Sequence, residues 1–204
     1  MKSLAYSLAI ALAVILPHTV LAQHHQLTDE IFAKKAAAGG LTEVQLGQLA
    51  EQNGASQAVK DFGAKMASDH GKANDNLKSV ASKDSLTIPD KPNAEQQAMI
   101  DKLSKEKGDA FDKAYVHAML RAHVQDRALF KEEIASAKNP DLKQFASDTL
   151  PVIEQHLDMI KKISENGPGA ASGSSVDMKM APPTASKSGV EATESTPGTA
   201  TSPQ

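Results

Sequence analysis

The 204-residue chain contains no cysteine and no tryptophan, and aromatic residues make up only 3% of it. Without cysteine there is no disulfide framework, no thiolate metal site and no thiol catalysis, so the core alone must hold a folded domain together. The scarcity of aromatic side chains argues against stacking platforms for bases or sugars. The net charge of −3 arises from interspersed acidic and basic residues, and without a basic field we expect no nucleic-acid partner.

Residues 1–22 are predicted to be a secretory signal peptide. Lys2 supplies the positive charge, Leu8 to Leu16 form the apolar run, and Val20-Leu21-Ala22 offers a small-residue cleavage site. The apolar run is shorter than the roughly 20 residues needed to span a bilayer, and no later run reaches that length. We therefore expect secretion to the periplasm and no transmembrane segment in the mature chain. Association with the outer membrane or cell envelope and homo-oligomer formation stay open.

Composition divides the remaining chain into one domain and a tail. Residues 27–165 are rich in alanine, leucine, lysine, glutamate and glutamine, which is the composition of helices. Residues 166–204 are dominated by glycine, serine, proline, threonine and alanine and show no helical or alternating period. Such a segment cannot bury enough apolar surface to offset its ordering entropy, so we predict a disordered tail.

Apolar residues at helical spacing predict four long helices within the domain, and no strand pattern competes with them. Cap signals and stop signals place these helices at residues 28–53, 56–82, 108–138 and 140–165, with a short extra helix at 94–105. A connection of about 25 residues separates the first pair from the second, which is long enough to cross the length of a bundle. The predicted fold is all-α, a ferritin-like antiparallel four-helix bundle with a long crossover between the second and third long helices.

Each of the four long helices carries one polar residue on its apolar stripe, near the middle of the helix. These residues are Glu43, His70, His123 and His156. Apolar stripes rarely accept a charged or imidazole side chain without a partner. Because mid-helix positions share one height in a bundle, the four side chains should meet inside it, which is how bundles build metal or cofactor sites.

The predicted metal centre includes one further carboxylate, because Asp126 lies one helical turn after His123 on the same face. The expected ligands are therefore Glu43, His70, His123, His156 and Asp126. Asp69 could be a further ligand, and either Asp69 or Asp126 could instead fix a histidine tautomer from outside the ligand set. Nitrogen and oxygen donors suit Fe, Zn, Mn, Cu or Ni, and the ligand types do not choose among these divalent ions.

Two further polar residues, His117 and Tyr115, lie on the same helix as His123. His117 lies about 160° from His123 around the helix, at roughly 100° per residue, so it should not join the site. Tyr115 is closer to the inward face and could donate a hydrogen bond to a carboxylate, although a core tyrosine with its hydroxyl at the rim is the more common case. The competing interpretation of the whole cluster is structural, with the histidines hydrogen-bonded to carboxylates or backbone carbonyls.

The chain resembles the secreted bacterial domain-of-unknown-function family 4142 over about residues 29–164. The resemblance is carried by Glu43, Asp69-His70, His123 and His156, within the segments FAKKAAAGGLTEVQLGQLA, DFGAKMASDHGKANDNL, FDKAYVHAMLRAHVQDRALF and LPVIEQHLDMI. It implies a ferritin-like helical bundle in the periplasm or on the outer envelope, where members are often labelled outer membrane proteins. It implies no established activity.

The diiron signature of typical ferritin-like proteins is missing from this sequence. Their Glu-x-x-His motif would require a glutamate three residues before a histidine, but Ala67 precedes His70 and Ile153 precedes His156 at that spacing. Ferroxidase chemistry is therefore not inferred, and an oxidoreductase is the least favoured class. The leading hypothesis is metal binding in metal handling or stress tolerance. The alternative is a non-catalytic envelope binding or scaffold module whose polar cluster is structural.

Overall fold

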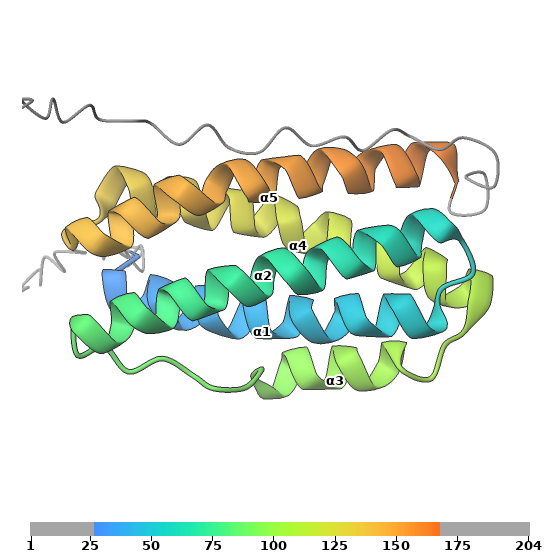
Figure 1. The fold of residues 1–204 in the computed structure, drawn as a ribbon, viewed down its shortest axis with the longest axis horizontal. Coiled ribbons are helices and arrows are strands. Elements are labelled where there is room, and N and C mark those ends of the chain that lie inside the picture. Colours follow the sequence, from blue (N-terminus) through green and yellow to red (C-terminus); the bar gives the residue numbers. More distant parts are fainter. Residues whose placement is uncertain (1–26, 168–204) are drawn as a thin grey trace, which may run out of the picture. The chain divides into compact units, whose positions relative to one another are not determined.

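The computed structural model describes residues 27–167, and all the regular structure in that range is helical (Figure 1). The helices are α1 (Asp29–Asn53), α2 (Gln57–Lys83), α3 (Ala94–Leu103), α4 (Gly108–Ser136) and α5 (Pro140–Asn166). None of these described helices is both long and apolar enough to cross a membrane. The predicted signal peptide and nearly all of the predicted tail lie outside the described residues.

Side-chain caps begin the helices where the sequence predicts them. The Thr28 hydroxyl accepts a hydrogen bond from the backbone N–H of Ile31 at 3.2 Å, and Ser56 caps α2 in the same way. At α5 the cap is Asn139, which accepts from two backbone N–H groups of the first turn. A cap satisfies N–H groups that have no partner within their own helix. The observed helix bounds differ from the predicted ones by only a few residues.

The four long helices contact one another in a closed order. Helix α1 packs against α2 and α4, α5 packs against α4 and α2, and α3 lies along α1 (Figure 1). Glycine allows α1 and α2 to approach closely, because a Cβ atom built on Gly47 would lie 2.5 Å from the carbonyl oxygen of Gly63. A Cβ on Gly40 would lie 2.3 Å from the Asn74 side chain. These close contacts set the distance between the two helices around Glu43.

The core consists of two apolar clusters separated by a polar layer. One cluster is built around Leu46, Phe62 and Met119, and the other around Phe32, Leu77 and Phe130. On each long helix the polar residue falls between its contributions to the two clusters. The residues of this layer are Glu43, His70, His123 and His156, and all four are buried. The prediction that they share one level inside the domain agrees with this arrangement.

Buried and partly buried carboxylates hold the two tight interhelical turns. Asp112 of α4 is fully buried, and its two oxygens accept from the backbone N–H groups of Ala55 and Ser56 at 2.9 and 2.8 Å. Asp29 of α1 accepts from the N–H groups of Lys138 and Asn139 between α4 and α5. Each helix pair is thus fastened at its turn by the other pair, which fixes the register of the helices that carry the polar layer.

Candidate metal centre

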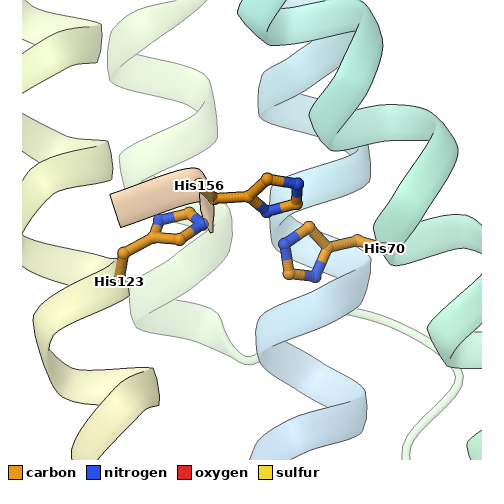
Figure 2. Close-up of side chains that lie close together, drawn as sticks. All are labelled: His70, His123 and His156. Carbon is orange, nitrogen blue, oxygen red and sulfur yellow. The ribbon is translucent and has the colours of Figure 1, made fainter. Parts of the chain in front are cut away.

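The three histidines of the polar layer face one another across the interior. His123 and His156 are completely buried and His70 is only 6% exposed. Their ring centroids are separated by 5.3 Å, 5.5 Å and 5.8 Å, which makes a nearly equilateral triangle. Figure 2 shows the three rings turned toward a common centre, with one nitrogen of each ring directed inward. The rings come from α2, α4 and α5, so only the folded domain brings them together.

The outer nitrogen of each ring is held by a different group. His123 Nδ1 lies 2.9 Å from the backbone oxygen of Met119, and because a carbonyl only accepts, this nitrogen carries the proton. His156 Nε2 lies 3.0 Å from an oxygen of Asp69, and His70 Nδ1 lies 3.0 Å from an oxygen of Glu43. Carboxylates and carbonyls in this position commonly fix the tautomer of a metal-binding histidine.

The inner nitrogens are consequently left as lone pairs. His70 Nε2, His123 Nε2 and His156 Nδ1 have no hydrogen-bond partner within residues 27–167. With the outer nitrogen protonated, a neutral imidazole has only an acceptor at the other nitrogen. Three acceptors that face each other repel and cannot satisfy one another. A cation supplies what this arrangement lacks, and one nitrogen from each ring can serve as its ligand.

The spacing of the rings matches that required by a tetrahedral or trigonal ion. With a metal–nitrogen bond of about 2.1 Å and a nitrogen about 1.2 Å from its ring centre, each centroid would lie about 3.3 Å from the metal. Ligand angles of about 109° then separate two centroids by about 5.4 Å. The observed separations of 5.3 to 5.8 Å need only small adjustments to reach this geometry.

Burial also sets the protonation state that metal binding requires. It lowers the pKa of His123 to about 4 and holds the pKa of His70 well below its usual value, with the neighbouring histidines adding to both effects. Both rings are therefore neutral at pH 7, and only a neutral imidazole can bind a metal. The hydrogen bond from His156, followed by the bond and charge of Lys65, keeps the pKa of Asp69 far below its usual range.

The two remaining predicted residues, Glu43 and Asp126, form a carboxylate pair beside the rings. Glu43 is 4% exposed, and one of its oxygens has no hydrogen-bond partner in the described part of the chain. Glu43, His123 and Asp126 also offer ligand atoms within 4.8 Å of one another. Burial raises the pKa of Asp126 to about 6, and burial followed by the Asp126 charge raises the pKa of Glu43. A cation beside the two carboxylates would stabilise their charged forms.

The structure assigns different positions to the residues around the cluster. His117 is exposed, as predicted. Tyr115 lies in the core as predicted, but the predicted rim position of its hydroxyl is wrong, because the whole side chain is buried and the hydroxyl has no partner among residues 27–167. Asp69 meets His156 because α2 lies between α1 and α5, so successive residues of α2 face different neighbours. Phe62 was not predicted here, and its edge contacts with His123 and His156 give the rings an apolar floor.

Solved structures with a similar fold include a protein from Streptomyces coelicolor described as a secreted protein DUF305. It is 14% identical, covers 69% of this chain and 94% of its own, and gives a TM-score of 0.57. CopM in its Cu(II)-bound form is also 14% identical, with a TM-score of 0.59 over 69% of this chain and 98% of CopM. At this identity the likeness concerns the fold alone.

Among curated proteins, none matches this chain. A family model does match it, over residues 16–163, which is most of the sequence and includes every residue of the polar layer. The resemblance drawn from the helical segments is thereby confirmed. The chain belongs to the family described as domain of unknown function DUF4142.

Proposed function

We propose that this protein binds a divalent transition-metal ion inside its helical domain, with His70, His123 and His156 as ligands. The observation that carries the proposal is the convergence of three buried imidazole nitrogens that have no partner within residues 27–167. Each ring is already oriented by a bond to its other nitrogen. The entropy cost of fixing the three ligand side chains would therefore arise during folding and not on metal binding.

The carboxylates have two roles in this proposal. Glu43 and Asp126 lie on one side of the rings, where they would balance the charge of the ion and offer oxygen ligands. Asp69 would act on the ion through His156, whose ring it orients. Three imidazoles suit Zn, Cu, Fe and Ni, whereas added carboxylates also accommodate Mn. The Cu(II)-bound state of CopM, which shares the fold, makes copper the first ion to test.

The proposed cellular setting is outside the cytoplasm, with a role in metal handling or stress tolerance. A predicted signal peptide supports secretion, as does the description of a structural neighbour as a secreted protein. Residues 27–165 would be the metal-binding domain, and residues 166–204 a disordered tail. Envelope association and self-association are left as questions for experiment.

We further propose that the domain is the ferritin-like antiparallel four-helix bundle expected from the sequence. Along α1 and α5 the Phe32 cluster precedes the Phe62 cluster, whereas along α2 and α4 the order is reversed. Each long helix would thus run opposite to the long helices that it contacts. The 84–107 connection, which contains α3, would return the chain along the domain so that α4 starts at the same end as α2.

Metal content provides the direct test of the proposed function. The full chain, purified after secretion, should contain stoichiometric metal, whereas the His70→Ala, His156→Ala double variant should lose it and stay helical. Circular dichroism would check helicity, and elemental analysis would measure the metal. Equal metal content in both proteins, or none in the wild type after titration with Cu²⁺ and Zn²⁺, would favour the scaffold alternative.

A further inference from the structure

A pocket of about 820 Å³ opens on the side of the domain formed by α1, α4 and the 84–93 connection. Its walls include Lys35 and Gly39 from α1, Leu129 from α4, and Pro89 and Lys91 from the connection. The polar layer otherwise has almost no contact with solvent. A pocket that reaches this layer would therefore connect the metal centre with solvent.

Asp126 belongs both to the pocket and to the metal centre. Its side chain lines the pocket, and its carboxylate lies within 4.8 Å of the ligand atoms offered by Glu43 and His123. Glu43 in turn contacts His70 at 3.0 Å. A series of carboxylate oxygens therefore leads from the pocket to His123 and to the outer nitrogen of His70, at the edge of the ring cluster. The unpartnered oxygen of Glu43, a residue that is 96% buried, is the intermediate step in that series.

Gly39 leaves the carboxylate of Asp126 open toward the pocket. A Cβ atom built on Gly39 would lie 4.0 Å from Asp126 Oδ1 and would meet no other described atom within 4 Å. Close helix packing therefore does not explain this glycine, in contrast to Gly47, where a Cβ would lie 2.5 Å from the Gly63 backbone. A larger side chain at position 39 would extend over the Asp126 carboxylate.

The opposite side of the ring cluster offers a poorer route. There Asp69 is partly exposed, with 21% of its side chain accessible, but its Oδ2 atom already contacts both His156 and Lys65 at 3.0 and 2.8 Å. An approaching cation would have to displace the ammonium group of Lys65 and would loosen the hydrogen bond that orients His156. Asp126 has no comparable cationic partner among the contacts of residues 27–167.

We propose that the pocket is the entrance through which a metal ion reaches the histidines, with Asp126 as the first carboxylate and Glu43 as the second. The inference rests on the proposed metal binding and adds its route. Lysines at the pocket outnumber its carboxylates, since Lys34, Lys35 and Lys91 face Asp90 and Asp126. The pocket as a whole therefore does not attract a cation electrostatically, and the attraction comes from the Asp126 carboxylate. On the way the ion exchanges bound water for the oxygens of Asp126 and then Glu43, so it keeps ligands throughout.

Stopped-flow binding of Co²⁺ to the full-length mature chain tests the route, since the weak visible absorption of hydrated Co²⁺ becomes much stronger when the ion enters a four-coordinate site with nitrogen ligands. Gly39→Leu should obstruct the passage and slow uptake by about tenfold or more, with the equilibrium affinity nearly unchanged. Gly39→Ala should bind at the wild-type rate. Gly71→Leu provides the matched control, because a Cβ at Gly71 would meet no described atom within 4 Å. Asp126→Asn should also slow uptake and needs no enlarged side chain.

The outcomes separate the route from the function. Equal uptake rates in the wild type, Gly39→Leu and Asp126→Asn would overturn the route, although metal binding itself would stand. A loss of equilibrium affinity in Asp126→Asn without slower uptake would also overturn it, because Asp126 would then act only on the bound ion and not on its entry. If the wild type binds no Co²⁺, Cu²⁺ or Zn²⁺ at equilibrium, the proposed function fails, and the route fails with it.

Discussion

Replacing Asp69 by asparagine should weaken metal binding, although Asp69 is not expected to touch the ion. The Asp69 carboxylate lies 3.0 Å from His156 Nε2 and leaves His156 Nδ1 as the inner donor. Asparagine keeps an oxygen that accepts from the ring but removes the charge that makes the ring a stronger donor. Loss of such an outer partner commonly reduces metal affinity by about 10- to 100-fold.

Thermal unfolding converts this change in affinity into a measurable shift. Free metal at about a thousand times the wild-type Kd stabilises the folded state by about 4 kcal/mol. For a domain of roughly 140 residues, with an unfolding entropy of about 0.3 kcal/mol per kelvin, Tm should rise by about 14 °C. At the same metal concentration the variant should gain only about 1.4 to 2.7 kcal/mol, or about 5 to 9 °C.

The comparison uses the metal-induced shift of each protein, so any direct effect of the substitution on the metal-free state cancels. Asp61→Asn is a suitable control, because Asp61 is an exposed carboxylate on the same helix and contacts only Gln57 among the hydrogen bonds of the described residues. It should keep the full shift, and Asp69→Ala should lose more than Asp69→Asn. The reasoning is refuted if all four proteins show the same shift with metal.

Three further expectations concern the metal-free protein. Burial raises the pKa of Glu133 to about 7. Ionisation of this carboxylate therefore destabilises the folded protein increasingly as pH rises from about 4.5 through 7. Glu133→Gln should therefore raise the free energy of unfolding by up to about 3 kcal/mol at pH 8 and by little at pH 4.5, as measured by urea denaturation. Asp112→Ala removes the acceptor of two backbone N–H groups and should cost about 2–4 kcal/mol in the same assay. Gly63→Ala places a Cβ 2.6 Å from the Gly47 oxygen and should cost about 1–3 kcal/mol, whereas Gly71→Ala should be neutral or stabilising in melts.

The helices and the common level of the polar residues could be predicted because both depend on local periodicity. Caps at Thr28 and Ser56, together with apolar residues every three or four positions, determine where the helices begin and which stripe faces inward. A polar residue on such a stripe must point into the core whichever neighbours it meets. Glu133 is a further example on α4, because it continues the helical spacing of His123, Asp126 and Phe130 and therefore lies on the inward stripe. Glu133 is buried, whereas the neighbouring Ile134 is only partly buried.

Asp69, other carboxylates and backbone carbonyls can be named from the sequence as candidate partners of the rings. Which of them each ring contacts could not be predicted, because it depends on how the helices are rotated about their axes. Asp69 and His70 are adjacent in sequence, yet one contacts α5 and the other contacts α1. The carbonyl of Met119 is equally invisible to a search for polar side chains, although it fixes the tautomer of His123. Which nitrogen of each ring faces inward therefore depends on how the helices pack, and so does the position of Asp126 at the wall of the pocket.

The inner nitrogens also distinguish metal binding from a purely structural cluster. A cluster that only fixed helix register would be expected to satisfy its polar atoms internally, because partly satisfied buried networks are costly. Here each ring uses its N–H on an outer partner and presents a lone pair to the other two. A water molecule has two protons and could satisfy two such lone pairs, leaving the third without a partner. A metal ion can accept all three at once, so the stabilisation it provides should depend on all three rings together.

The single variants His70→Phe, His123→Phe and His156→Phe should consequently each abolish most of the metal-induced rise in Tm, although they fill the core with a ring of similar shape. If any one of them keeps the full rise, that ring is not a ligand and the three-histidine site is wrong.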